Sequence, residues 1–137
     1  NVALPARLAR RRTDRTSIDR ALADVGLVDR GGHRPGQLSG GQQQRVAIAR
    51  VLAMQPDVVF ADEPTGSLDT ATGADVLRLL RAAASEDRSV VVVTHDLEAA
   101  AIADRVLVLR DGTIHGELQR PTPGQVLEAI TLAGAAA

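Results

Sequence analysis

The stretch VVFADEPTGSLD, at residues 58–69, decides the fold. It begins with four apolar residues and continues directly into Asp62 and Glu63, before a Pro-Thr-Gly turn. An unbroken apolar run without polar alternation is typical of a strand covered on both faces, as in a parallel sheet between helices. The stretch therefore predicts a buried strand at 58–61 with two acidic residues at its carboxyl end.

Two more apolar runs of this kind follow, at 90–93 and 106–109. Residues with helical periodicity fill the intervals between the three runs, over about 70–85 and 97–103. The order strand, helix, strand, helix, strand predicts an α/β fold with a parallel sheet and right-handed crossovers.

The end of the chain predicts an antiparallel edge to this sheet. Asp111-Gly112 is a tight-turn sequence, and the polar alternation after it indicates an edge strand that ends near Leu118. A last helix is expected over 121–132, and we expect residues 135–137 to fray.

The N-terminal part predicts helices. An amphipathic helix is expected from Thr13 onward, and Gly26 can end it. The glycine and proline residues in 29–37 predict a loop there. A second helix opens at Ser39 and cannot continue past Pro56.

Composition excludes several kinds of chemistry. The chain has 137 residues and no cysteine, so thiol catalysis, disulfides and zinc-thiolate sites are excluded. All 16 basic residues are arginine, so a Schiff-base lysine and a G-x-x-x-x-G-K-[ST] phosphate loop are absent. Residues 1–55 have a net charge of +6 and residues 56–137 of −7. A basic half can bind nucleic acid, but Phe60 is the only aromatic residue, and we expect no nucleic-acid partner.

Asp62 and Glu63 are candidate catalytic residues. Ligands of open parallel sheets bind at the carboxyl ends of the strands. An aspartate there can hold Mg²⁺, and an adjacent glutamate can orient or deprotonate a water. The alternative is that both acids only solvate the strand end or cap a turn.

The sequence LSGGQ, at residues 38–42, is a candidate anion site. Ser39 with Gln42 has the form of a capping box, so Gly40 and Gly41 lie in the first turn of a helix, where backbone N–H groups are unpaired. Each glycine costs the helix roughly 1 kcal/mol relative to alanine. An ordinary capped helix is the alternative, but it gives no reason for that cost.

Two further residues have both a structural and a functional interpretation. His95 follows the apolar run at 90–93, where it can cap or face solvent, or donate a hydrogen bond to a phosphate. Asp69 can simply cap the helix that begins at residue 70. His33 and His115 have no such context.

Together these motifs resemble the nucleotide-binding subunit of ATP-binding cassette (ABC) transporters. The segment 38–42 is similar to the signature motif of that family, 58–63 to its Walker B strand, 67–69 to its D-loop and His95 to its switch histidine. The resemblance covers about residues 1–118. The sequence of residues 62–69, together with NVALP at residues 1–5, looks most like the subgroup that serves lipoprotein-release, macrolide-export and cell-division permeases.

The resemblance implies a fold and partners. The fold would be a partial P-loop NTPase, with residues 1–55 in the helical signature subdomain and 56–137 in the C-terminal part of a RecA-like core. Two subunits would face head to tail with ATP and Mg²⁺ between them and would power an integral-membrane permease. The subunit would then be cytoplasmic and peripheral on the inner face of the cell membrane, bound through that permease.

The resemblance also implies a role for each site residue. Asp62 would bind Mg²⁺, Glu63 would be the general base and His95 would contact the γ-phosphate. The residues facing the ATP of the opposite subunit would be Ser39, Gly40, Gly41 and Gln42. Asp69 would couple the two sites across the interface. Phosphoryl transfer needs such placement and charge neutralisation more than covalent chemistry.

This sequence departs from the family at one place. The phosphate loop, the adenine-stacking aromatic residue and the Q-loop glutamine all precede the segment that resembles residues 1–5. We therefore expect the chain to be the C-terminal portion of a longer subunit that is inactive without the rest.

Three other functions remain open from the sequence. ABC-type ATPases of DNA repair share these motifs but carry long coiled coils. ABC proteins of translation carry two cassettes and a charged linker. A non-catalytic docking module would suit the missing phosphate loop.

Overall fold

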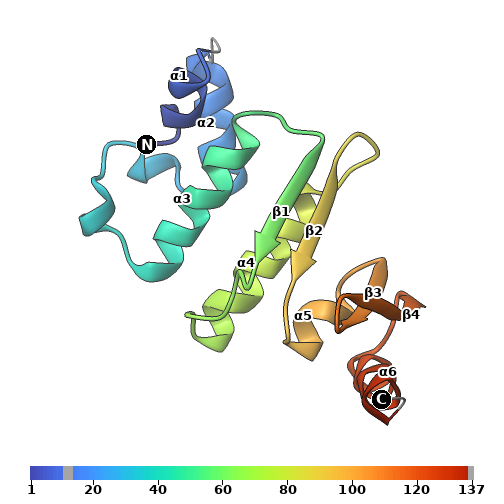
Figure 1. The fold of residues 1–137 in the computed structure, drawn as a ribbon. Coiled ribbons are helices and arrows are strands. Elements are labelled where there is room, and N and C mark those ends of the chain that lie inside the picture. Colours follow the sequence, from blue (N-terminus) through green and yellow to red (C-terminus); the bar gives the residue numbers. More distant parts are fainter. Residues whose placement is uncertain (11–13, 136–137) are drawn as a thin grey trace. The chain divides into compact units, whose positions relative to one another are not determined.

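The computed structural model describes residues 1–10 and 14–135 (Figure 1). The elements in chain order are α1 (Leu4–Leu8), α2 (Arg15–Asp24), η1 (Val28–Arg30), η2 (Pro35–Gln37), α3 (Gly40–Leu52), β1 (Val58–Asp62), α4 (Thr70–Ala83), β2 (Ser89–Val93), α5 (Leu97–Ala101), β3 (Arg105–Arg110), β4 (Thr113–Gln119) and α6 (Pro123–Ala135). The predicted start of the first helix at Thr13 and the predicted fraying of 136–137 lie outside the described residues, and Ala135 ends α6.

The chain divides into two compact units, Asn1–Val91 and Val92–Ala137. This division follows packing and falls inside β2. The functional division into a helical part, 1–55, and an ATPase-core part, 56–137, stays a prediction.

The parallel strand pair that the sequence predicts lies in the first unit as far as Val91. β1 pairs with β2, their arrows run in the same direction in Figure 1, and α4 connects them. This β-α-β arrangement confirms the α/β class. Val59 is 6% exposed whereas its neighbour Phe60 is 77% exposed. The contrast arises because successive side chains of a strand point to opposite faces.

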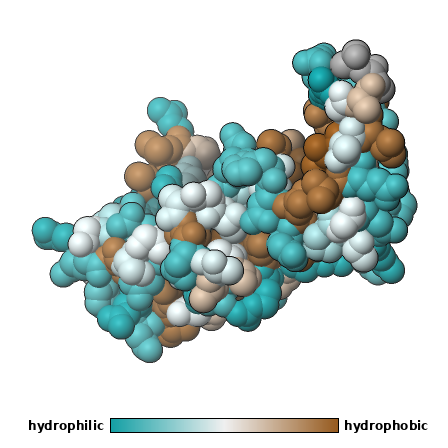
Figure 2. All heavy atoms as spheres, turned by 90° about the horizontal axis from the view of Figure 1, so that it is seen from below, coloured by the Kyte–Doolittle hydropathy of each residue, from teal (hydrophilic) through white to brown (hydrophobic). Residues whose placement is uncertain are grey.

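The expectation that both faces of these strands are covered is therefore wrong for the described residues. One face of β1 lies toward α3 and α4, and a cavity of about 190 Å³ lined by all three elements remains there. Val58, Phe60 and Val91 leave apolar surface exposed. Hydrophobic surface among hydrophilic residues is visible in the space-filling view of Figure 2.

Within the described residues, α2, α3 and α4 lie where the sequence predicts helices, and one short helix is an addition. Asp14 caps α2, and Gly26 follows it with φ of 69°. Glycine adopts this conformation without strain and is common after helix ends. The short helix α1 is the addition; its Pro5 has the φ angle that suits a first turn. The predicted loop 29–37 contains η2 and most of η1, two short 3-10 turns.

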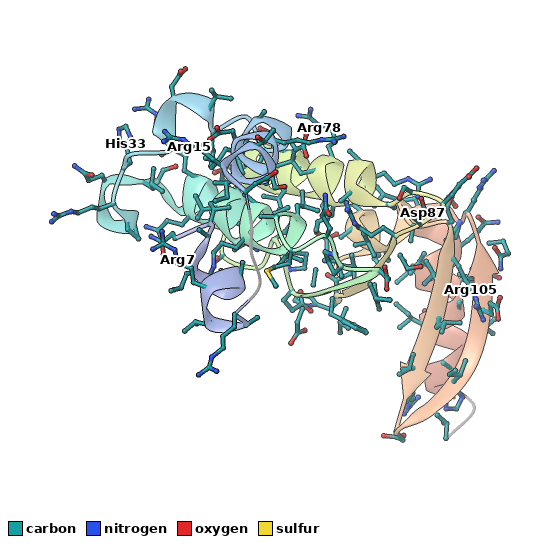
Figure 3. All side chains as sticks on the ribbon, turned by 90° about the horizontal axis from the view of Figure 1, so that it is seen from above. Arg7, Arg15, His33, Arg78, Asp87 and Arg105 are labelled. Atoms are coloured by element: carbon teal, nitrogen blue, oxygen red, sulfur yellow. The ribbon has the colours of Figure 1, made fainter. Side chains whose placement is uncertain are left out.

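The second unit holds a β-hairpin and two helices. β3 pairs antiparallel with β4, with a register irregularity between Val108 and Leu109. Asp111 and Gly112 both have positive φ, which confirms the predicted tight turn. Arg105 on β3, labelled in Figure 3, forms an ion pair of 2.9 Å with Glu117 on β4.

The prediction that the run at 106–109 joins the parallel sheet is wrong. The described residues form two two-stranded sheets, and β3 belongs to the hairpin. An apolar run indicates burial but does not name the pairing partner, and the tight turn brings β4 to β3 at a small entropic cost.

No helix among residues 1–10 and 14–135 combines the length and the apolar character needed to span a bilayer.

Candidate active site

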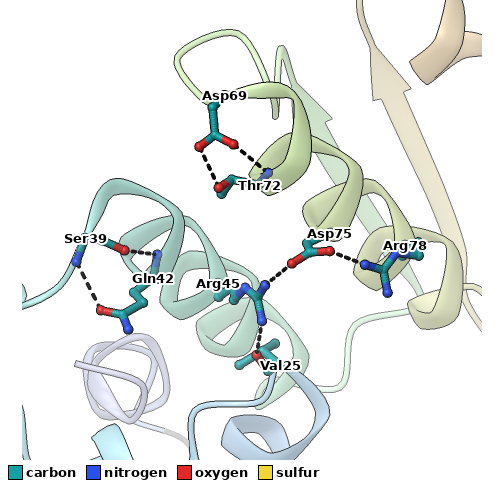
Figure 4. A network of polar contacts seen from close by, with 8 residues as sticks. All are labelled: Val25, Ser39, Gln42, Arg45, Asp69, Thr72, Asp75 and Arg78. Atoms are coloured by element: carbon teal, nitrogen blue, oxygen red, sulfur yellow. Dashed lines mark hydrogen bonds and ion pairs between the residues drawn. The ribbon is translucent and has the colours of Figure 1, made fainter.

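The tip of α3, residues 38–42, is a capped helix N-terminus (Figure 4). The Ser39 hydroxyl accepts a hydrogen bond from the Gln42 backbone N–H at 3.3 Å, and the Ser39 N–H donates to the Gln42 side-chain oxygen at 3.1 Å. The predicted capping box is therefore confirmed. The helix begins at Gly40, so the remaining N–H groups of the first turn are available to an anion.

The two glycines of this tip differ in their surroundings. A Cβ added to Gly40 would meet nothing within 4 Å, so this position is open to a ligand or a partner. A Cβ added to Gly41 would lie 2.3 Å from the Cγ2 methyl of Thr72 on α4. The sequence alone assigned both glycines to the approach of an anion; the structure shows that Gly41 also permits the approach of a helix.

Asp62 and Glu63 lie where the sequence predicts, at the carboxyl end of β1. Asp62 is the last residue of the strand and is exposed, while Glu63 is half-buried. Glu63 has φ of 42°. This value lies in the left-handed region, which is uncommon for residues other than glycine. Its carbonyl accepts a hydrogen bond of 3.2 Å from Gly66 N, which closes a tight turn.

Asp62 fits a role as a ligand of Mg²⁺. Its carboxylate is a hard oxygen donor at the surface, the kind that this cation prefers. Among the described residues, no group of three or more acidic or histidine side chains could hold a metal ion. Magnesium sites that use one or two carboxylates, with phosphate and water supplying the other ligands, do not need such a group.

Asp69 caps α4, as the structural interpretation of the sequence predicts. Its carboxylate accepts the Thr72 backbone N–H at 3.0 Å and the Thr72 hydroxyl at 2.7 Å. The Thr72 side chain, and then its backbone N–H, hold the pKa of the Asp69 carboxyl below its ordinary value of 3.8. A coupling role across an interface stays a prediction.

His95 belongs to the second unit. It follows β2, and Asp96 after it caps α5 by accepting the backbone N–H groups of Glu98 and Ala99. His95 lines a cavity of about 130 Å³ within that unit. Asp62 and Glu63 belong to the first unit, and His95 belongs to the second.

Three residues with contacts near the helix tips were not predicted from the sequence: Thr72, Arg45 and Asp75. Arg45 Nη2 on α3 lies 2.6 Å from Asp75 Oδ2 on α4, and Arg45 Nη1 donates to the Val25 carbonyl at 3.5 Å (Figure 4). Asp75 also pairs with Arg78. The signal for Thr72 was present, because a threonine three residues after an aspartate N-cap can donate both hydroxyl and backbone N–H to it. Arg45 and Asp75 lie 30 residues apart, and their pairing has no local sequence signal.

The family of this chain follows from comparison with known proteins. Residues 2–66 match the family model described as "ABC transporter". The dimeric structure of MJ0796, a bacterial ABC transporter cassette, superimposes with a TM-score of 0.71 at 40% identity, over 88% of this chain and 55% of that one. The structure of cbiO1 from Clostridium perfringens gives a TM-score of 0.72 at 30% identity, over 88% and 48% of the two chains.

The chain belongs to the ABC transporter family and contains part of its ATPase fold. Within that family it is similar to macrolide export ATP-binding/permease proteins. It is 51% identical over 125 residues to the one from Rhodospirillum rubrum, covering 90% of this chain and 19% of that protein. It is 48% identical over 116 residues to the one from Neisseria meningitidis, covering 83% and 18%. The chain thus spans about a fifth of the length of these relatives, and the predicted subgroup is confirmed.

Proposed function

We propose that this chain forms part of the ATP-binding, ATP-hydrolysing subunit of an ABC transporter, which drives an integral-membrane permease by ATP-dependent head-to-tail dimerisation. The observation that carries the proposal is the α3 tip, a capped helix N-terminus whose Gly40 leaves open space on a fixed backbone. Backbone N–H groups at such a terminus favour a phosphate through both hydrogen bonding and the helix dipole.

The proposed roles divide the site between two copies of the subunit. Residues Ser39, Gly40, Gly41 and Gln42 face the ATP held by the opposite copy. Asp69, at the tip of the adjacent helix α4, contacts that copy and couples the two sites. Because the α3 tip reaches the nucleotide only in the assembled dimer, hydrolysis depends on assembly.

The strand end supplies the acid–base chemistry. Glu63 accepts a proton from the attacking water, and its left-handed backbone supports this role, since strained residues cluster at functional sites. Asp62 holds Mg²⁺, which supplies charge neutralisation at the phosphates when bound. His95 donates a hydrogen bond to the γ-phosphate.

The partner is an integral-membrane permease, because the macrolide-export relatives are named as combined ATP-binding and permease proteins. The ATPase part would then lie at the inner face of the cell membrane, held there by the permease.

The test is Glu63→Gln in the complete subunit. We expect ATP binding to remain and turnover to fall by at least about a hundredfold, because removal of a general base costs about that much. Size-exclusion chromatography with ATP should show a stable dimer that the wild type forms only transiently. Glu86→Gln, at an exposed glutamate before β2, is the matched control and should keep wild-type turnover. Undiminished hydrolysis in Glu63→Gln would exclude Glu63 as the base.

A further inference from the structure

Thr72 lies where the tips of α3 and α4 meet, and its side chain contacts both (Figure 4). The hydroxyl branch donates a hydrogen bond of 2.7 Å to Asp69 Oδ2. The methyl branch, Cγ2, is the atom that a Cβ at position 41 would meet at 2.3 Å. One small side chain therefore fills the contact at Gly41 and also binds the cap of α4.

The two branches of Thr72 cannot move independently. Both are attached to the same Cβ, so a rotation that withdraws the methyl from Gly41 also withdraws the hydroxyl from Asp69. That hydroxyl bond is made to a carboxylate, which makes it one of the stronger hydrogen bonds of a protein. A side chain at position 41 would have to break this bond or push the helices apart.

A second contact between the same two helices lies one turn further on. Arg45 follows Gly41 by four residues and Asp75 follows Thr72 by three, so each pair lies on one face of its helix. Their ion pair of 2.6 Å, with the Arg45 bond to the Val25 carbonyl, fixes α3 against α4 beyond the tip. Two successive turns thus hold the helices in one register.

We propose that Thr72 is a positioning residue that sets the spacing between the α3 tip and Asp69. The proposal rests on the proposed function, in which both of these groups face the opposite copy of the subunit. Thr72 contacts no nucleotide in this arrangement; it makes the signature residues and the D-loop aspartate one rigid surface. Position 41 must then be glycine for two reasons: a Cβ there would collide with the Thr72 methyl, and it would hinder the approach of the phosphate.

The experiment compares Gly41→Ala, Thr72→Ser and the double variant in the complete subunit. Gly41→Ala should lower kcat by at least about tenfold, as small misplacements of catalytic groups do, and should lower the unfolding temperature by about 5 °C or more. Thr72→Ser removes the methyl and keeps the hydroxyl, so it should change kcat by less than about threefold. In the double variant the added Cβ has room, so the unfolding temperature should return to within about 2 °C of the wild-type value, and kcat should rise at least about threefold above that of Gly41→Ala.

Gly40→Ala is the matched control for unfolding, because its Cβ enters open space, and it should not lower the unfolding temperature. Equal losses in Gly41→Ala and in the double variant would overturn the proposal, since direct contact of Gly41 with the nucleotide would then explain the whole effect. Equal unfolding temperatures for Gly40→Ala and Gly41→Ala would overturn it as well.

Thr72→Val keeps the proposal testable if Gly41→Ala does not fold. Valine preserves the shape beside Gly41 and removes only the bond to Asp69. We expect kcat to fall at least about tenfold with the KM for ATP within about twofold of wild type, and the pKa of Asp69 to rise in an NMR titration. An unchanged kcat in Thr72→Val would overturn the proposal. Absence of ATPase activity in the wild-type complete subunit would instead refute the proposed function. The unfolding temperatures of Gly41→Ala, Thr72→Ser and their double variant, and the NMR titration of Asp69, would still decide the role of Thr72.

Discussion

At the tips of α3 and α4, Ser39 and Asp69 cap their helices with backbone φ of −64° and −66°. Their extended conformation is the usual one for N-caps. The turn after β1 is different, because Glu63 there has φ of 42°. That conformation costs a glutamate free energy, since its Cβ crowds the backbone. Both regions belong to the proposed site.

The difference separates two tasks. The helix tips are relaxed and bound in place by Ser39, Thr72 and Arg45, which suits a surface that must fit another molecule without rearrangement. The strand end keeps one residue in an unfavourable conformation, which suits a group whose direction matters more than its contribution to stability. A variant that removes the strain at Glu63 should therefore raise stability, whereas a variant that loosens the tips of α3 and α4 should lower it.

Arg45→Ala tests the binding of the helix tips and should give the larger change. The side chains of Arg45 and Asp75 are only 26% and 35% exposed, and their ion pair connects residues 30 positions apart. We expect the free energy of unfolding to fall by about 1–3 kcal/mol, from the lost charged hydrogen bonds and the lost packing of the arginine stem. Chemical denaturation of the complete subunit measures this change.

Arg78→Ala is the control for Arg45→Ala. Arg78 also pairs with Asp75, but its side chain is 77% exposed and its partner lies in the same helix. Such exposed pairs contribute little, so the loss should stay below about 0.5 kcal/mol. Similar losses at the two positions would mean that the connection between α3 and α4 does not depend on Arg45.

Glu63→Asn tests the strain at the strand end and should raise stability. Asparagine occupies the left-handed region several times more readily than other non-glycine residues do, so the free energy of unfolding should be about 0.5–1 kcal/mol higher than that of Glu63→Gln, which also lacks the carboxylate, while turnover is lost. Glu63→Gln keeps the straight side chain and the strain, so it is the reference for Glu63→Asn. An equal or lower stability of Glu63→Asn would show that the left-handed conformation at residue 63 costs the glutamate no free energy.

The local features of the site could be predicted from the sequence because each depends on residues three or four apart. The sequence spacing correctly placed the capping box of Ser39 and Gln42, the cap at Asp69 and the acidic residues at the end of β1. The helices and strands follow for the same reason, since periodicity reports which face of an element is apolar.

The features that the sequence did not predict depend on distant residues. Each of them requires knowledge of which elements pack together. These features are the pairing of β3 with β4 in a two-stranded sheet, the solvent-exposed face of β1 at Phe60, and the ion pair of Arg45 with Asp75. The role of Gly41 is an instructive case. Glycine beside glycine in a helix signalled a close approach, but only the structure shows that Thr72 makes it.

The pH dependence of the α4 cap should give the smallest effect. The pKa of Asp69 is lower in the folded protein than its ordinary value of 3.8. Its contribution to stability is therefore complete above about pH 4. That contribution is lost as the pH falls through the lower folded value, when the carboxylate is protonated and no longer accepts the Thr72 bonds as a charged group.

Asp69→Asn should therefore unfold at a lower temperature than the wild type at pH 7, by a small margin because asparagine also caps helices well. The margin should shrink below about pH 4 in thermal unfolding followed by circular dichroism. Asp87→Asn, in the exposed turn before β2, caps no helix and should show no such margin. A margin for Asp69→Asn that does not change with pH across this range would mean that the Asp69 charge does not contribute to the cap, and that Thr72 is held at the α3 tip by packing alone.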